Sequence, residues 1–448
     1  MKYNSLKTNL SKNFKSFSSG FSSKSKRMGT IGIIGLDPLA AANLNKEIVS
    51  YGNSIGMIDD QHFPEILTVG IKSRDSRHLQ DQANLCFDFG CDLVAIPQET
   101  GDSKLAKRIS NDISSIPVFT LEQNMKELAK KVTNYANELE KPRRNKIVIH
   151  ENIEELQIIE NLKNDQKIRL WRINDRKEYG GYSVLKNGFI GVIGGAGPLA
   201  SADFCFKLAQ TLTPFVHYSA NSAPGKHRFE MENGPSYIEH YKNAVNFFDS
   251  INATNLAIPC NTAHKRLEEF CKNSLSKIID IRQCVFEEYP NAEKLILFGT
   301  KATTGVGLNE GEIGAYEKLR CEKYSDKSNF IVPSQQDQEK IMTAIYSVKA
   351  GELDKAKEII LDVVCQARKE NGNFFVILGC TELPLVFKDI ELCDLKFIDP
   401  AELLLTKCRQ EIIKFQTPST TIKKVSDLSY FENLNLKKAD ATKKTNFI

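Results

Sequence analysis

Two short peptides each place a cysteine where an α/β fold commonly does its chemistry. One reads Ile258-Pro-Cys-Asn-Thr-Ala-His264, and the other reads Ile377-Leu-Gly-Cys-Thr-Glu-Leu-Pro384. In both, the cysteine follows a short apolar run expected to be a strand and precedes a segment expected to be helical. The free N–H groups at the start of such a helix bind a carboxylate and lower the pKa of a thiol. Each peptide therefore predicts a reactive cysteine beside an anion-binding loop.

The pairing of these cysteines indicates proton transfer on two faces of one carbon atom. Cys260 and Cys380 share the same strand–Cys–Thr context although they lie 120 residues apart. Inversion of a stereocentre needs a base that removes a proton from one face and an acid that delivers a proton to the other. A single cysteine of this kind is more simply explained as a buried packing residue. Its recurrence in the same context favours a pair of catalytic thiols.

The rest of the chain alternates short apolar runs with segments of helical periodicity. This alternation is typical of parallel sheets that are covered by helices on both faces, and it predicts an α/β fold. In open sheets of this kind, ligands gather at the carboxyl ends of the strands, where both cysteines are expected. Strands are expected at 31–34, 93–96, 146–149, 189–193, 255–258, 295–298, 374–378 and 396–398.

The chain also contains a partial internal repeat. Gly32–Ala40 resembles Gly191–Ala200, and Cys91–Pro97 resembles Thr254–Pro259, at nearly the same spacing. The first copy has lost glycines from its turn, and Gln98 stands where the second copy has its cysteine. Without that thiol we expect the first copy to be non-catalytic. It is expected to cover the catalytic lobes, to imitate a dimer partner or to bind a regulatory ligand.

Residues 189–410 resemble the aspartate/glutamate racemase superfamily, and most closely its aspartate racemase branch. The resemblance implies two similar, doubly wound parallel-sheet lobes with the active site in the cleft between them. It also implies racemisation of aspartate or glutamate by the two cysteines, with no pyridoxal phosphate, other cofactor or metal. The matching segments, in family order, are Ile193–Ala200, Pro259–His264, Val332–Gln338, Gly379–Glu382 and Ile398–Pro400.

The resemblance also implies which residues hold the substrate. Asn261, Thr262 and Thr381 are expected to hold its α-carboxylate and ammonium groups. Arg228 and Lys318 are the candidates for the distal carboxylate, because an Arg fork and a Lys point charge both suit that group. The alternative is that these two cations are solvated surface charges.

Further residues of the expected site come from the ends of two other motifs. Asn221 and Glu382 are expected to contact the substrate, although an acid at a helix start also complements the helix dipole. Gly195 and Gly197 form a turn that fits a dinucleotide-binding fingerprint, but the next strand lacks the acid that binds ribose. The resemblance implies instead that this turn lines the substrate cleft. His264 is expected on the helix surface or behind the site rather than as a base.

The domain layout follows from the repeat and the resemblance. We expect a basic tail at 1–27, an N-terminal α/β domain resembling one lobe at 28–185, racemase lobes at 186–292 and 293–415, and a Lys-rich tail at 416–448. The tails carry net charges of +7 and +3 out of a total of +4, which leaves the body at −6. An acidic body is a poor platform for nucleic acid. No apolar run is long enough to cross a membrane.

The eleven cysteines do not follow a metal-binding spacing, and their odd number predicts a reduced, cytoplasmic protein. The expected partner is a small acidic amino acid, with a homodimer or an internal pseudo-dimer formed through the N-terminal domain. Two alternatives stay open. One is a same-fold isomerase of another small carboxylate, similar to hydantoin racemases or maleate isomerases. The other is a non-catalytic ligand-binding or regulatory protein.

Overall fold

The computed structural model describes most of the residues that lie between the two expected tails. It describes residues 28–35, 37–57, 62–72, 76–97, 109, 116–121, 124–139, 147–149, 170–172, 182–195, 197–221, 223, 236–290, 294–323, 330–387 and 396–417. The expected N-terminal tail, nearly all of the expected C-terminal tail, Gln98 and Arg228 lie outside these residues. Within the described ranges, no helix has the length and apolar character needed to cross a membrane.

The largest sheet has eight strands in the order β10-β9-β7-β8-β2-β1-β3-β4. Neighbouring strands are parallel within each half, whereas β2 and β8 meet in antiparallel register at the centre. Outward from this junction, both halves have the same strand order, as the internal repeat predicts. The strands are β1 Ile31–Ile33, β2 Ile66–Gly70, β3 Leu93–Ile96, β4 Val118–Thr120, β7 Ile190–Gly194, β8 Phe215–Ser219, β9 Asn255–Ala257 and β10 Lys277–Ile279.

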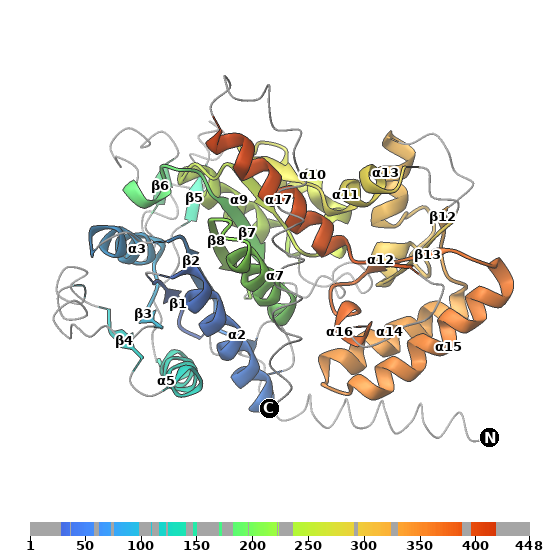
Figure 1. Ribbon diagram of the computed structural model, residues 1–448, viewed down its shortest axis with the longest axis horizontal. Helices are drawn as coiled ribbons and strands as arrows, with labels where there is room; N and C mark the ends of the chain where they lie inside the picture. Colours follow the sequence, from blue (N-terminus) through green and yellow to red (C-terminus); the bar gives the residue numbers. More distant parts are fainter. Residues whose placement is uncertain are drawn as a thin grey trace, which may run out of the picture.

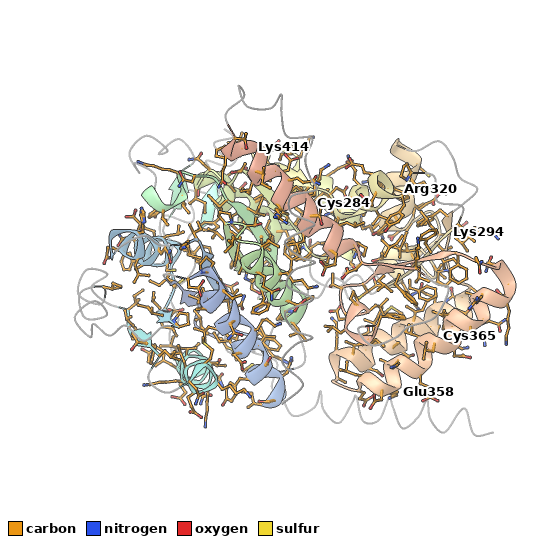
Figure 2. The ribbon with its side chains drawn as sticks, in the orientation of Figure 1. Cys284, Lys294, Arg320, Glu358, Cys365 and Lys414 are labelled. Atoms are coloured by element: carbon orange, nitrogen blue, oxygen red, sulfur yellow. The ribbon has the colours of Figure 1, made fainter. Side chains whose placement is uncertain are left out.

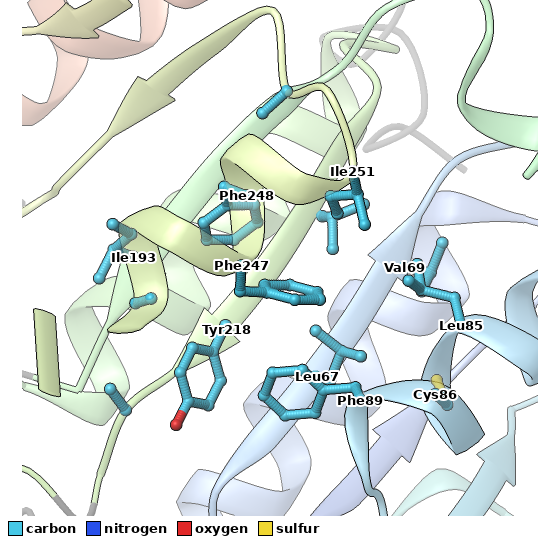
Figure 3. Close-up of a cluster of buried hydrophobic side chains, with 14 of the residues drawn as sticks. Leu67, Val69, Leu85, Cys86, Phe89, Ile193, Tyr218, Phe247, Phe248 and Ile251 are labelled. Carbon is cyan, nitrogen blue, oxygen red and sulfur yellow. The ribbon is translucent and has the colours of Figure 1, made fainter. Parts of the chain in front are cut away.

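Helices cover both faces of this sheet and join its two halves. On one face α2 and α7 lie side by side across the junction (Figure 1). On the other face Phe89 packs edge-on against Tyr218 and Phe247, with ring centroids 4.8 and 4.7 Å away (Figure 3). Burying each such side chain contributes about 1.5–3 kcal/mol. The helices are α2 Pro38–Ser54, α3 Ser76–Phe89, α5 Met125–Glu138, α7 Pro198–Gln210, α9 Ile238–Ser250, α10 Leu267–Cys271 and α11 Ile281–Glu288, with short 3-10 turns η4 Ser183–Leu185 and η5 Thr262–Arg266.

The second lobe is built on a four-stranded parallel sheet in the order β12-β11-β13-β14. The antiparallel helices α14 and α15 cover one face, and α13 covers the other with its buried Tyr316. The strands are β11 Leu295–Gly299, β12 Phe330–Ile331, β13 Phe375–Gly379 and β14 Lys396–Ile398. The helices are α12 Lys301–Thr304, α13 Ala315–Lys323, α14 Gln335–Lys349, α15 Leu353–Asn371 and α16 Pro384–Phe387.

The last helix, α17 Pro400–Gln416, follows the second lobe in sequence but packs on the first. Asp399 caps it by accepting a hydrogen bond from Ala401 N–H at 2.9 Å, and Pro400 fits its first turn. Leu404 and Cys408 pack in one apolar cluster with Cys284 of α11. Figure 2 labels Cys284 and, near the end of α17, Lys414. Because α17 starts in one lobe and ends on the other, it fixes how the lobes sit relative to each other.

The architecture confirms the expected fold class. The chain is a mixed α/β protein with mostly parallel sheets, two lobes and an extra N-terminal α/β region. The extra region adds β1, β2, β3 and β4 to the sheet of the first lobe. Its remaining strands, β5 Ile147–Ile149 and β6 Leu170–Arg172, pair with each other in a separate two-stranded sheet.

Candidate active site

Both cysteines lie at the carboxyl ends of interior strands. Cys260 is the third residue after β9, which lies between β7 and β10, and Cys380 directly follows β13, which lies between β11 and β14. The two residues are 9% and 7% exposed. Burial of this degree strengthens electrostatic interactions around each thiol. The strand-end placement agrees with the sequence prediction.

Threonine side chains connect the loops that carry the cysteines. The hydroxyl of Thr262 lies 2.8 Å from that of Thr300 and 3.2 Å from that of Thr303. Thr303 also packs on Gly379, because a β-carbon added at that glycine would lie 3.2 Å from Cγ2 of Thr303. Thr303 of the second lobe therefore contacts residues close to both Cys260 and Cys380.

A second contact between the lobes involves the glycine turn. Gly197 has a φ of 143°, and a β-carbon added there would lie 2.7 Å from Oε1 of Glu382. The other carboxylate oxygen of Glu382 accepts a hydrogen bond from the Cys380 thiol at 2.8 Å. The hydroxyl of Thr381 is 3.5 Å from the same oxygen. The structure thus brings together three predicted site residues, Gly197, Glu382 and Cys380.

Burial raises the pKa of the Cys380 thiol well above its ordinary value, and the charge and hydrogen bond of Glu382 raise it further. Lys349, whose ammonium is 3.9 Å from Glu382, opposes this only weakly. The prediction that a helix N-terminus lowers the pKa of this thiol is therefore wrong for Cys380. The helix that follows, α16, has four residues and begins only at Pro384, so its dipole is small. Cys380 is held as a protonated thiol, which is the form of an acid.

Asn261, next to Cys260, presents an unpaired donor. Its side chain is buried at 2% exposure, and its Oδ1 accepts a hydrogen bond from the Tyr316 hydroxyl at 2.8 Å. Its Nδ2 has no partner in the described part of the chain. Leaving a buried donor unpaired costs about 1–3 kcal/mol, so such a group favours an incoming acceptor. This agrees with the expected contact between Asn261 and a substrate carboxylate.

Tyr316 is a site residue that the sequence prediction missed. Burial raises the pKa of its hydroxyl well above the ordinary value, so the group stays protonated and donates to Asn261. The signal available in the sequence was that Tyr316 lies two residues before Lys318, the candidate for the distal carboxylate. In the structure, Lys318 forms an ion pair at 3.2 Å with Glu268, whose side chain is 72% exposed. Exposed pairs of this kind contribute about 0–1 kcal/mol.

His264 is buried behind Cys260 and is not on a helix surface. Its Nδ1–H donates to the backbone carbonyl of Cys260 at 2.8 Å, and its Nε2 lies 4.0 Å from Oδ1 of Asp280. Burial lowers its pKa to about 4, although the charge of Asp280 opposes the shift. A neutral imidazole in this position fixes the backbone of the cysteine, in agreement with a supporting role.

Asn221 uses both ends of its side chain within the protein. Its Oδ1 accepts a hydrogen bond from the Ser219 hydroxyl at 2.7 Å, and its Nδ2 donates to the backbone carbonyl of Pro64 at 2.7 Å. Its neighbour Ala220 packs against Gly195, where an added β-carbon would lie 2.5 Å from the Ala220 carbonyl. These bonds engage both the oxygen and the nitrogen of the amide within the protein. The contact between Asn221 and the substrate stays a prediction.

Comparison with known proteins finds similarity over the C-terminal half of the chain. A model of the Asp/Glu/hydantoin racemase family matches residues 193–408. Aspartate racemase from Picrophilus torridus is 25% identical, with 50% of this chain and 94% of that protein covered at a TM-score of 0.42. An aspartate racemase homologue from Pyrococcus horikoshii is also 25% identical, with 50% and 99% covered at a TM-score of 0.40.

A curated relative covers less of the chain. An uncharacterised protein from Pectobacterium carotovorum is 26% identical over 145 residues, which is 32% of this chain and 87% of that protein. The family match carries the assignment, because it spans both cysteine loops, the glycine turn and the second-lobe strands. Residues 193–408, which include both cysteine loops, match the model of the Asp/Glu/hydantoin racemase family.

Proposed function

We propose that this protein racemises aspartate or glutamate without a cofactor, with Cys260 and Cys380 as the acid and base on opposite faces of the α-carbon. The observation that carries the proposal is that contacts between the two lobes lie beside both cysteines. Thr262, two residues after Cys260, contacts Thr303 of the second lobe, and Glu382, two residues after Cys380, contacts Gly197 of the first lobe. The match of residues 193–408 to the racemase family model supports a reaction of this class.

The proton would move between the two sulfur atoms by way of the substrate. In one direction, the thiolate of Cys260 takes the proton from the α-carbon, and the thiol of Cys380 delivers its own proton to the opposite face. In the other direction the two cysteines exchange roles: the thiolate of Cys380 takes the proton from the α-carbon, and the thiol of Cys260 delivers its own proton to the opposite face. Glu382 accepts a 2.8 Å hydrogen bond from the Cys380 thiol and so favours the form in which Cys380 is the proton donor.

The donors around Cys260 would stabilise the carbanion-like transition state. The free Nδ2 of Asn261 is placed to donate to the α-carboxylate, while Tyr316 holds the amide in that orientation. A preorganised donor in a buried site stabilises developing negative charge without a cost of reorganisation at the moment of reaction. The hydroxyl of Thr262 is a further donor beside the same cysteine.

The test is a D/L assay of both acidic amino acids with no added cofactor. Cys260→Ala and Cys380→Ala should each abolish racemisation, because each removes the proton carrier of one face. Cys205→Ala is the matched control, since Cys205 is fully buried in an apolar cluster. Normal racemisation by both site variants would refute the two-thiol mechanism.

A second measurement separates the two half-reactions. Exchange of the α-proton with deuterated solvent needs only one functional base, so it can survive in one variant for a single enantiomer while racemisation is lost. The same assay with a hydantoin substrate addresses the broader range of the family, whose description includes hydantoin racemases.

A further inference from the structure

The antiparallel junction places one end of the N-terminal region beside the candidate site. In the pairing of β2 with β8, Ile66 lies opposite Ser219 and Gly70 lies opposite Phe215. The residues just before β2 therefore lie at the carboxyl end of β8. That is also the edge of the sheet where Cys260 follows β9, because β8 and β9 both run parallel to β7.

Two buried hydrogen bonds tie this end of β2 to the end of β8. The Asn221 amide donates to the Pro64 carbonyl at 2.7 Å, and the Tyr218 hydroxyl donates to the Glu65 carboxylate at 3.1 Å. Asn221 is completely buried and Glu65 is 5% exposed. Hydrogen bonds in so dry an environment resist displacement by water. The N-terminal region therefore fixes the backbone of residues 218–221.

A continuous set of contacts leads from this segment to Cys380. The backbone of Ala220 lies against Gly195, where a β-carbon would approach to 2.5 Å. Two residues later, Gly197 lies against Glu382, where a β-carbon would approach to 2.7 Å, and Glu382 accepts the hydrogen bond from Cys380. Each contact is too tight to hold an additional methyl group. A shift of residues 218–221 would therefore press on the glycine turn that contacts Glu382, the carboxylate partner of Cys380.

The N-terminal region does not offer an equivalent turn of its own. Gly35, which corresponds in the repeat to Gly194, donates its N–H to the side chain of Gln82 at 3.0 Å. Gln82 in turn donates to the carbonyl of Ile71 at 3.0 Å. A side chain of the region itself thus occupies the backbone donor of this turn. This arrangement fits a supporting role better than an independent binding site.

We propose that the N-terminal region is a positioning part of the racemase site, and that Asn221 and the start of β2 set the place of Glu382 and Cys380. The expected change in kcat rests on the proposed function. The expected change in the surroundings of Cys380 does not. It assigns Asn221 to positioning, in place of the direct substrate contact expected from the sequence. In this role Asn221 acts through Gly195 and Gly197.

The test uses the full-length chain with Asn221→Ala and, as a milder variant that keeps the ring, Tyr218→Phe. We expect Asn221→Ala to lower kcat ~10-fold or more while KM changes by less than about 2-fold, because small displacements at a catalytic group cost large factors in rate. The rate of Cys380 alkylation by iodoacetamide, followed by peptide mass spectrometry, should change by about 3-fold or more, since it depends on the thiol's surroundings. Tyr218→Phe should change both readouts in the same direction.

The matched control is Lys46→Met, which breaks a 3.0 Å ion pair with Asp203 at the same junction, between α2 and α7. It should leave kcat and Cys380 alkylation within about 2-fold of the unsubstituted protein, because a partly exposed pair contributes little. Unchanged kcat and alkylation in Asn221→Ala and Tyr218→Phe would overturn the proposal. A change in KM alone would also overturn it, in favour of direct substrate contact. If the unsubstituted chain racemises neither amino acid, the alkylation rates still decide the positioning claim.

Discussion

The tight contact between Gly197 and Glu382 makes Gly197→Ala an informative perturbation. The new methyl group would start 2.7 Å from Oε1 of Glu382, whereas an ordinary van der Waals contact begins at 3.4 Å. The carboxylate must therefore retreat by about 0.7 Å. Its other oxygen holds the Cys380 thiol at 2.8 Å, so a retreat of this size stretches or breaks that hydrogen bond.

Gly197→Ala should change two quantities that can be measured separately, kcat and the free energy of unfolding. A hydrogen bond to a charged group contributes about 1.5–3 kcal/mol, so its loss should lower kcat about 10- to 100-fold. The φ of 143° at Gly197 is unfavourable for any residue with a side chain, which should lower the free energy of unfolding by about 1–3 kcal/mol. The first part appears in steady-state racemisation kinetics and the second in urea denaturation.

Gly351→Ala separates these effects, because it carries the strain without the contact. Gly351 lies in the turn between α14 and α15 with a φ of 79°, and an added β-carbon would meet no atom within 4 Å. This variant should lose stability but keep its kcat. The reasoning is refuted if Gly197→Ala keeps its kcat, or if Gly351→Ala loses a comparable factor.

Two further predictions concern the donor beside Cys260 and the acid stability of the fold. Tyr316→Phe removes the hydroxyl that orients Asn261, so kcat/KM should fall ~10-fold; an unchanged value in steady-state kinetics would contradict this role. Burial lowers the pKa of His217 to about 3 and of His264 to about 4, from an ordinary value of 6.5. Both are neutral in both states well above pH 6.5, but below it only the unfolded chain takes up protons until the folded pKa values are reached. Each histidine should therefore lower the free energy of unfolding by about 2 kcal/mol at pH 5 relative to pH 7.5. Equal stability in urea denaturation at the two pH values would contradict this.

The sequence predicted several interior strands well because their patterns are local, although it missed β2 at the centre of the large sheet. The strands expected around Ile31, Leu93, Ile190 and Leu295 are present with bounds that differ by one residue at most. The edge strands β4, β10 and β12 were also missed, whereas the edge strand β14 was predicted with its bounds. β10, Lys277–Ile279, has three residues and only one fully buried side chain, so it offers too little alternation to be distinguished from a loop.

The candidate site was predictable where its residues lie within a recognisable motif. Thr262 and Glu382 lie within the two cysteine motifs and Gly197 lies in the glycine turn, but Thr303 and Tyr316 come from helices that only the folded chain brings there. α13 shows the physical limit most clearly. Residues two apart on a helix point to different sides, so when Tyr316 points inward to Asn261, Lys318 must point outward. A motif that names both residues does not state which of them faces the site.

The two copies of the repeat separate what packing requires from what chemistry requires. Pro97 and Pro259 follow equivalent buried strands, so that proline belongs to the turn and not to catalysis. The copies differ at Gln98 and Cys260, and the first copy also lacks a counterpart to the glycine that contacts Glu382. Yet the first copy keeps a strand that pairs with β8 along its whole length and removes an open sheet edge beside the site. What this copy retains is therefore the surface that supports its neighbour, which is the part a positioning domain needs.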